Sequence, residues 1–268
     1  MSQPEWAPDD IDIDRPSASR IYDAWLGGSH NFAVDREIAR QTEAVWPDVV
    51  RYARANRAFL GRAVRFLAEQ GVRQFLDIGS GIPTASNVHQ VAQRIDPDAR
   101  VVYVDIDPVA VAHSRAILDG SDRTAVLQAD FRQPRDIIDQ VRDRELLDLD
   151  RPVAVLIVAM LHFVPNSDDP WSAVATLVDA AGSGSYLVLT QGASGTSEEA
   201  DERIRELYRR TPTPLTPRDR AETERFFSGF ELVEPGLVNL PDWRPDPTEE
   251  LDDRFENAVI YAGVGRKR

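Results

Sequence analysis

The sequence predicts an α/β fold built on a doubly wound and mainly parallel sheet. Two observations lead to this prediction. Short apolar segments alternate with amphipathic ones from residue 74 onward, and the first apolar segment runs directly into the glycine turn Gly79-Ser80-Gly81. Alternating strands and helices assemble through right-handed crossovers into a parallel sheet. A glycine turn between a strand and a helix presents backbone N–H groups to a bound cofactor.

The composition narrows the classes of function. Cysteine is absent, which excludes disulfides, thiolate metal sites and cysteine nucleophiles. The four histidines lack metal-ligand spacing, so we expect no metal site, although carboxylates alone could bind magnesium. The net charge of −14 would repel phosphate backbones, so nucleic acid is not an expected partner. The acidic N-terminus is unlike a signal peptide, and the longest apolar run, Val153 to Leu161, is too short to span a membrane. We therefore expect a cytoplasmic protein, and its oligomeric state stays open.

Residues 1–71 are expected to form an N-terminal arm and a helical cap. The polar residues 1–16 are interpreted as a loosely ordered arm. A short helix is predicted to begin near Ser17 or Ser19 and to end at Gly27-Gly28. The polar and aromatic stretch that follows, Ser29 to Phe32, has two interpretations: a connector between two helices, or a lid over the open end of the sheet.

Residues 49–70 are predicted to form a long amphipathic helix that stops at Gly71. The apolar side chains expected to face the core recur at helical spacing: Val50, Ala53, Leu60, Val64 and Leu67. Asn56 and Arg57 fall on the same face, where an arginine needs a partner. Arg57 then either pairs with a neighbouring helix or, like Asn56, reaches the active-site cleft. The remaining arginines are expected to form a solvated face: Arg51, Arg54, Arg62 and Arg65.

From residue 72 onward, strands and helices are expected to alternate. The predicted strands are 74–78, 100–108, 125–130, 153–158, 186–190, 230–234 and 258–262, and the predicted helices are 87–95, 109–118, 133–143, 168–181, 197–209 and 217–228. The fourth strand is the most apolar and so the most central. Asp168 or Asp169 before Pro170 marks one helix start, and Thr216-Pro217 marks another.

Three acidic residues stand near predicted strand ends: Asp77, Asp105 and Asp130. In a doubly wound sheet, ligands bind outside the carboxyl ends of the strands. An acid after the second strand is placed to accept hydrogen bonds from ribose hydroxyls. An acid after the third is placed to accept one from an adenine amino group, with Phe131 flanking the ring. Together with the glycine turn, these residues indicate an adenosine-containing cofactor.

Two such cofactors fit this geometry. A dinucleotide requires the phosphate-binding pattern Gly-x-Gly-x-x-Gly, whose third glycine position is occupied here by Thr84, preceded by Pro83. That departure tells against NAD. S-adenosylmethionine carries no phosphate, and its cationic sulfonium suits an acidic pocket. The sequence therefore favours S-adenosylmethionine.

The same motifs resemble those of the class I S-adenosylmethionine-dependent methyltransferases. Asp77 to Gly81 is similar to their glycine motif, Val104 to Pro108 to their ribose motif, and Gln128 to Phe131 to their adenine motif. Over residues 17–264 the chain more closely resembles an actinobacterial S-adenosyl methyltransferase family formerly designated a domain of unknown function. The segments that carry this resemblance are Arg20–Gly28, Asn31-Phe32, Asn56–Leu60, Phe75–Gly79, Pro83-Thr84, Asn87–His89, Val102–Asp105 and Leu161–Pro165.

This resemblance implies a Rossmann-like, seven-stranded sheet of order 3-2-1-4-5-7-6 with an antiparallel last strand, in residues 72–268. It implies methyl transfer from S-adenosylmethionine to an acceptor that the family does not identify and that we expect to be a small molecule. The alternative is a non-catalytic S-adenosylmethionine-binding sensor or interaction protein. Pro83 departs from the wider superfamily, in which a third glycine is common, so the path of the turn beside the methionine moiety stays open.

The residues expected around the cofactor are Asp77, Gly79, Ser80, Gly81, Asp105, Ile106, Asp130, Phe131, Ala159, Tyr22, Gly28 and His30. Asp77 either binds the amino group through water or only shapes the turn. Asp107 is an alternative ribose ligand, or else the cap of the helix that starts near Pro108.

Two catalytic candidates follow from the same placement. His162, after the fourth strand, is the candidate general base, which is needed only if the nucleophile must lose a proton. Its other interpretation is a histidine in the pocket wall. Tyr22, in the cap, is the second catalytic candidate. His89 and His113 are expected to be surface or packing residues.

Overall fold

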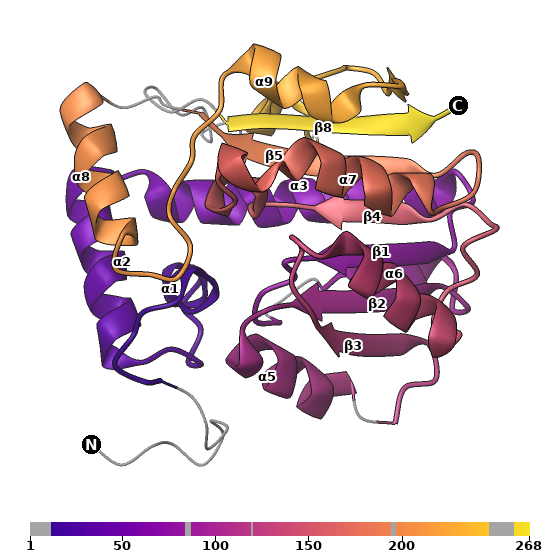
Figure 1. Ribbon diagram of the computed structural model, residues 1–268, viewed down its shortest axis with the longest axis horizontal. Helices are drawn as coiled ribbons and strands as arrows, with labels where there is room; N and C mark the ends of the chain where they lie inside the picture. Colours follow the sequence, from indigo (N-terminus) through magenta and orange to yellow (C-terminus); the bar gives the residue numbers. More distant parts are fainter. Residues whose placement is uncertain (1–11, 84–86, 119, 194–196, 247–259) are drawn as a thin grey trace.

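A mixed sheet forms the centre of the protein, for which we describe a computed structural model (Figure 1). The structure describes residues 12–83, 87–118, 120–193, 197–246 and 260–268. The predicted arm up to residue 11, Thr84 at the third glycine position and the first two residues of the predicted last strand lie outside these ranges.

The sheet has the strand order that the family resemblance implies. Its strands are β1 (Gln74–Ile78), β2 (Arg100–Asp105), β3 (Thr124–Gln128), β4 (Ala154–Ile157), β5 (Tyr186–Gly192), β6 (Phe230–Leu232), β7 (Val238–Asn239) and β8 (Ile260–Lys267). They follow the order β3-β2-β1-β4-β5-β8-β6, with β1 to β5 parallel and β8 antiparallel to both neighbours. The predicted order 3-2-1-4-5-7-6 is confirmed, because the predicted seventh strand is β8. The two-residue β7, which pairs with β8, was not predicted.

The helices lie on both faces of the sheet and at one end of it (Figure 1). They are α1 (Ala18–Trp25), α2 (Ala33–Val45), α3 (Val49–Glu69), α4 (Val88–Ile95), α5 (Pro108–Leu118), α6 (Pro134–Asp143), α7 (Pro170–Asp179), α8 (Glu198–Tyr208) and α9 (Arg220–Glu224). The predicted helix 217–228 is shorter than expected: α9 is capped by Asp219, and a 3₁₀ turn over Arg225–Phe227 follows it. Within the described ranges, no helix is both long and apolar enough to cross a membrane.

Successive side chains of β4 enter two different cores. Ala154 and Leu156 belong to a cluster that also contains residues of α1 to α4. Val155 and Ile157 belong to a second cluster with residues of α6 and α7. Both faces of β4 are buried, as its continuous apolar run predicts. Because α1 to α3 share the first core with the sheet, the expected helical cap packs directly onto it, and the boundary after residue 71 stays a prediction.

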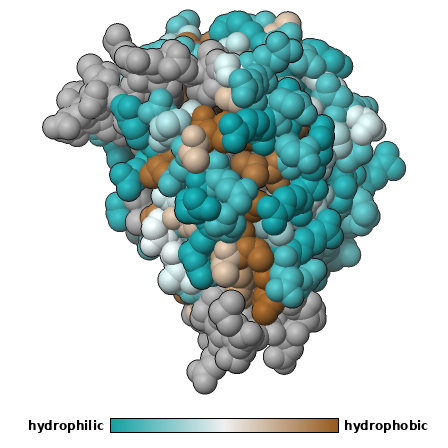
Figure 2. Space-filling view, turned by 90° about the vertical axis from the view of Figure 1, so that its left-hand side faces the viewer, coloured by the Kyte–Doolittle hydropathy of each residue, from teal (hydrophilic) through white to brown (hydrophobic). Residues whose placement is uncertain are grey.

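The exterior of the cap is mostly hydrophilic. Figure 2 looks onto the side of the molecule that carries α2 and α8 in Figure 1, and hydrophobic residues lie there in small groups, from the middle of the face toward its lower end, within a mostly hydrophilic surface. One arginine of α3 departs from the predicted solvated face. Arg62 is 8% exposed, and its Nε donates a hydrogen bond to the carbonyl oxygen of Trp243 at 3.1 Å. The prediction was wrong because the segment around Trp243 covers this side of α3, where the indole makes edge-to-face contacts with Phe59 and Phe66.

Two glycines make opposite demands on packing, which gives a matched pair of substitutions. A Cβ at Gly265 in β8 would lie 2.8 Å from Cδ1 of Phe227 and 2.9 Å from Cβ of Phe230. Gly265→Ala should lower the free energy of unfolding by about 1–3 kcal/mol through overpacking. A Cβ at Gly61 in α3 meets no atom within 4 Å among the described residues. Gly61→Ala should raise the free energy of unfolding by about 1 kcal/mol, because alanine has the higher helix propensity. Urea denaturation of both variants tests this, and two changes of the same sign would contradict it.

Candidate functional site

The candidate site lies at the carboxyl ends of the parallel strands, where the predicted residues converge. The turn after β1, the end of β2 and the loop after β4 meet at this edge. Gly79 and Ser80 both donate their backbone N–H to the carbonyl oxygen of Val104, at 2.8 and 3.2 Å. Gly81 donates its N–H to Oδ2 of Asp105 at 2.7 Å. The glycine turn is therefore fastened to the end of β2.

Both glycines of the turn have a positive φ, +68° at Gly79 and +66° at Gly81, which favours glycine over other residues. They face different surroundings. A Cβ at Gly79 would lie 2.4 Å from Cγ of Met160, so this glycine admits the side chain that follows β4. A Cβ at Gly81 would meet no described atom within 4 Å. The second glycine leaves its backbone approachable, as a cofactor would need.

Asp105 presents a buried and fixed carboxylate at this edge. Its Oδ1 accepts a hydrogen bond from the backbone N–H of Asp107 at 2.8 Å, and its Oδ2 accepts the one from Gly81. The backbone N–H of Ile106 also stabilises the charged carboxylate. An ionised carboxylate has about four acceptor positions, so at least about one remains for a ligand. Next to it, Ile106 is 50% exposed, one of the few large apolar side chains with that much exposure among the described residues. A fixed acceptor beside an exposed apolar side chain suits a ribose and an adenine face.

Asp107 caps the N-terminus of α5, which is one of the two roles expected for it. Its Oδ1 accepts a hydrogen bond from the N–H of Val109 at 2.8 Å in the first turn of α5. The two acids after β2 thus divide their tasks: Asp105 faces the glycine turn, and Asp107 holds the helix start.

Burial shifts the pKa values of two acids at this edge, Asp77 and Asp105, upward. Desolvation raises the pKa of Asp77 to about 7; the nearby charge of Arg57 lowers it, and that of Asp105 raises it. Desolvation also raises the pKa of Asp105 to about 6, against the hydrogen bond from Asp107. Arg57 reaches from α3 to the N-terminus of α4, where its Nη2 donates to Oδ1 of Asn87 at 3.4 Å. The cap therefore brings a cation to the turn that follows β1.

A chain of hydrogen bonds links the cap to the ends of β4 and β5. The N–H of Ala159 donates to Oγ1 of Thr190 at 2.8 Å, and that hydroxyl donates to Oδ1 of Asn56 at 2.8 Å. Nδ2 of Asn56 donates to the hydroxyl of Tyr22 at 3.1 Å, which donates to the carbonyl oxygen of Ala53 at 2.9 Å. Ala159 has a positive φ of 56°. The chain fixes a strained residue directly after β4.

Tyr22 is fully engaged in this chain. Burial raises the pKa of its phenol, although the charge of Arg57 and the hydrogen bond from Asn56 oppose the shift. The phenol is therefore neutral near pH 7 and suits positioning better than proton abstraction. Its catalytic role stays a prediction.

His162 lies after β4, as predicted, but its surroundings are apolar and cationic. It is 6% exposed, its ring packs 4.4 Å from the ring of Phe163, and its Nδ1 has no hydrogen-bond partner among the described residues. Desolvation and the charge of Arg218 lower the pKa of His162 to about 3. The imidazole is neutral near pH 7. This fits the pocket-wall interpretation better than the general base, which stays a prediction.

Sequence reasoning missed Arg218, which organises the loop after β4. Arg218 is 1% exposed and donates to the carbonyl oxygens of Leu161 and Val164, at 2.7 and 2.6 Å, and to Oε1 of Gln191 at 3.2 Å. Its guanidinium also lies over the ring of Trp171, 5.3 Å from the centroid. Only its place just after the helix signal Thr216-Pro217 hinted at a role.

The residues predicted at the adenine and cap sides have partners of their own. Oδ2 of Asp130 accepts a hydrogen bond from Arg132 at 2.6 Å. Partial burial alone would raise the pKa of Asp130, but its hydrogen bonds from Arg132 lower it. Phe131 is buried in the core shared with α6. The ring of His30 lies against that of His113 in α5, with centroids 3.5 Å apart and the ring planes tilted by 35°. Their roles toward a cofactor stay predictions.

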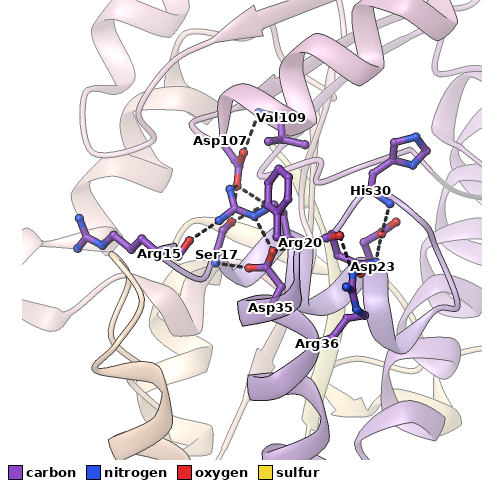
Figure 3. Close-up of polar contacts among 12 residues, drawn as sticks. Arg15, Ser17, Arg20, Asp23, His30, Asp35, Arg36, Asp107 and Val109 are labelled. Carbon is purple, nitrogen blue, oxygen red and sulfur yellow. Dashed lines mark hydrogen bonds and ion pairs between the residues drawn. The ribbon is translucent and has the colours of Figure 1, made fainter. Parts of the chain in front are cut away.

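Asp23 fixes the loop that carries Gly28 and His30. Its Oδ2 accepts hydrogen bonds from the N–H of His30 at 3.0 Å and from Nδ2 of Asn31 at 2.8 Å (Figure 3). A Cβ at Gly28 would lie 1.9 Å from Oδ1 of Asp23, so any other residue there would have to displace this carboxylate. The loop after α1 is thus a built turn that approaches α5.

A cavity of about 690 Å³ lies away from these residues, at the opposite edge of the sheet. It lies beside Gln74 and Arg100, at the amino ends of β1 and β2, and its rim is charged. Ligands of doubly wound sheets bind at the carboxyl ends, so this cavity is not the candidate site. Within the described parts of the chain, no cluster of three histidine, aspartate or glutamate side chains could hold a metal ion.

The chain is similar to known proteins over nearly its whole length. A family model described as S-adenosyl methyltransferase matches residues 4–268. The solved structure of a DUF574 family protein from Streptomyces avermitilis is 39% identical, covers 96% of this chain and 99% of its own, and has a TM-score of 0.88. A protein from Thermobifida fusca, proposed to be a methyltransferase, is 41% identical, covers 99% and 100%, and has a TM-score of 0.89. A comparison with curated proteins finds no match.

The raised pKa of Asp77 predicts a stability penalty that the substitution Asp77→Asn removes. The folded pKa of about 7 exceeds the ordinary value of 3.8, so the penalty is absent below pH 4 and fully present above pH 7. At pH 8 the free energy of unfolding of the variant should be about 1–4 kcal/mol higher than that of the wild type, and this difference should vanish near pH 4. Urea denaturation at both pH values measures it. The exposed Asp139→Asn on α6 is the control, and an equal gain there would contradict the assignment.

Proposed function

The chain belongs to the S-adenosyl methyltransferase family, and from this premise we propose that it binds S-adenosylmethionine and directs its methyl group to a small-molecule acceptor. The observation that carries this proposal is the Asp105 carboxylate, held by two backbone N–H groups beside the exposed Ile106. When bound, the cofactor supplies an electrophilic methyl group on a sulfonium. The residues of the chain bind it, orient it and exclude water.

The adenosine half would occupy the edge formed by β2 and β3. The remaining acceptor positions of Asp105 suit the ribose hydroxyls, and a hydrogen bond to an ionised group is worth about 1.5–3 kcal/mol. Ile106 offers an apolar surface for the adenine face. Asp130 and Phe131 follow β3 at the same edge and complete this side of the proposed site.

The methionine half is a zwitterion with an ammonium group and a carboxylate, and the site offers a group of opposite charge for each. Asp77 would accept the ammonium group, and Arg57 would hold the carboxylate. The charge of Arg57 lowers the pKa of Asp77, which supports the proximity of the two groups, and the hydrogen bond from Arg57 to Asn87 supports the location of the guanidinium after the glycine turn. Gly79, Ser80 and Gly81 supply the approachable backbone between them.

Ala159 to His162 would line the side of the methyl group, with Tyr22, Gly28 and His30 closing the site from the cap. Methyl transfer forms a bond from the nucleophile to the methyl carbon and returns the electron pair of the broken bond to sulfur. Holding the nucleophile in line can contribute about 7–11 kcal/mol. The neutral His162 can accept a hydrogen bond from the acceptor, while the low pKa of His162 makes it a weak base.

One observation favours a second function, a non-catalytic S-adenosylmethionine-binding sensor. Both catalytic candidates are poor bases near pH 7, because burial lowers the pKa of His162 and raises that of Tyr22. A sensor needs the cofactor contacts but no base. Turnover with any acceptor would exclude it.

Calorimetric titration with S-adenosylmethionine, S-adenosylhomocysteine and NAD tests the proposal. We expect micromolar binding of the two adenosyl compounds and none of NAD. Asp105→Ala should weaken that binding about 10- to 100-fold, since the ribose loses charged acceptors. Asp98→Ala, an exposed acid before the start of β2, is the control and should leave the affinity unchanged. An unchanged affinity in a folded Asp105→Ala protein would sink the ribose assignment.

Binding should also depend on pH. The ionised forms of Asp77 and Asp105 are the binding forms, and the pKa values of the free protein are about 7 and about 6. The affinity for S-adenosylhomocysteine should therefore fall as the pH drops from 8 to 6, and binding at pH 7 should release protons. Calorimetry in buffers of different ionisation enthalpy measures this release. A flat profile between pH 6 and 8 would exclude both carboxylates as direct ligands.

A further inference from the structure

The beginning of α1 is anchored to the loop that follows β2. Oδ2 of Asp107 accepts hydrogen bonds from the hydroxyls of Ser17 and Ser19, the latter at 2.8 Å, and lies 3.6 Å from Nη1 of Arg20 (Figure 3). Its other oxygen caps α5 through the N–H of Val109. One buried carboxylate therefore joins the N-terminal cap to the sheet.

Arg20 is itself held from the opposite side. Its Nε donates to Oδ2 of Asp35 in α2 at 2.9 Å, and its guanidinium lies 5.1 Å from the centre of the Phe32 ring. Asp35 also accepts the backbone N–H groups of Ser17 and Phe32. Both Arg20 and Asp35 are buried. An arginine side chain held between two fixed carboxylates has little conformational freedom. The position of Asp107 therefore depends on the position of α1, which carries Arg20.

The position of Asp107 matters because its backbone fixes Asp105. The N–H of Asp107 donates to Oδ1 of Asp105, whose Oδ2 is held by Gly81. A loop that moves with the Asp107 side chain would change the orientation of the carboxylate proposed to bind the ribose. The path from the cap to the ligand is Arg20, Asp107, Asp105, each in hydrogen-bond or ion-pair contact with the next.

Packing supports the same anchor. Phe32, at the end of the cap loop, shares a small apolar cluster with Ile82 after the glycine turn and with Val109 and Ala110 in α5. The cap thus contacts the glycine turn and the start of α5 together. A buried ion pair adds little net stability compared with apolar packing, so its value lies in geometry.

We infer that Arg20 is a positioning residue for cofactor binding: together with Ser17 and Ser19 it holds Asp107, whose N–H sets the orientation of Asp105. This inference rests on the proposed function, because it assigns the cap a part in that same site. By linkage, cofactor binding and docking of the cap stabilise each other by the same factor.

The test uses two variants that preserve local structure. Arg20→Lys retains the charge beside Asp35 but cannot reach both carboxylates with a planar fork. Asp107→Asn retains an oxygen to cap α5 but removes the charge that faces Arg20. Each should weaken S-adenosylhomocysteine binding at least tenfold by calorimetry on the folded full chain. The double variant should lose little more than either single variant, because both break one path. Arg40→Lys, an exposed arginine of α2 paired with Glu37, is the control and should stay within twofold.

A second readout needs no cofactor. The amide protons of Gly81 and Asp107 both bond to Asp105, so they should exchange with solvent faster in Arg20→Lys than in the wild type or Arg40→Lys. A residue with only a structural role would lower the melting temperature without changing these amides selectively. Unchanged exchange, or affinity within twofold of the wild type in folded Arg20→Lys, overturns the inference. If the wild type binds no adenosyl compound while the exchange difference is present, the proposed function fails and the positioning path is supported.

Discussion

The candidate site depends on one buried carboxylate that ties two strands together. Asp105 receives the N–H of Gly81 from the turn after β1 and the N–H of Asp107 from its own loop. These bonds hold the turn and the end of β2 at a fixed separation, and Met160 fills the space that Gly79 leaves. The arrangement is unfavourable for the unliganded protein, because burial raises the pKa of both Asp77 and Asp105. A cationic or hydroxyl-rich ligand would relieve that penalty. The same buried carboxylates therefore favour ligand binding and lower the stability of the unliganded protein.

The sheet contributes acids to this edge, and the cap contributes arginines. Arg57 acts on Asp77, and Arg20 contacts Asp107. Neither half would bury these charges favourably alone, since an unpaired buried charge is strongly destabilising. The cap is therefore part of the same electrostatic unit as the sheet, although it precedes the first strand in the sequence. Packing supports the same conclusion, because α3 and the sheet share one apolar core.

The sequence was sufficient to predict those features that depend on residues close together in the chain or on a known motif. The glycine turn, the strand order and the cap role of Asp107 follow from short motifs and from the family resemblance. It was insufficient where the partner is distant. Arg62 looks solvated by helical periodicity, yet its acceptor is the carbonyl of Trp243, 181 positions away. The buried state of Arg218 depends on carbonyls 57 and 54 positions away, and the pKa of His162 depends in turn on Arg218. Helical periodicity predicts which face of a helix is apolar, but it does not predict which distant segment of the chain packs over the polar face.

The electrostatics of the site bear on how it could act. The pKa values of the Asp77 and Asp105 carboxyls are about 7 and about 6, while that of the His162 imidazole is about 3, which reverses the usual order of these groups. If the carboxylates hold the cofactor, as proposed, they are not available to take a proton from the acceptor. The catalytic contribution then has to come from alignment, which the rigid chain from Ala159 through Thr190 and Asn56 to the cap supports. Such a site favours an acceptor whose nucleophile needs no strong base.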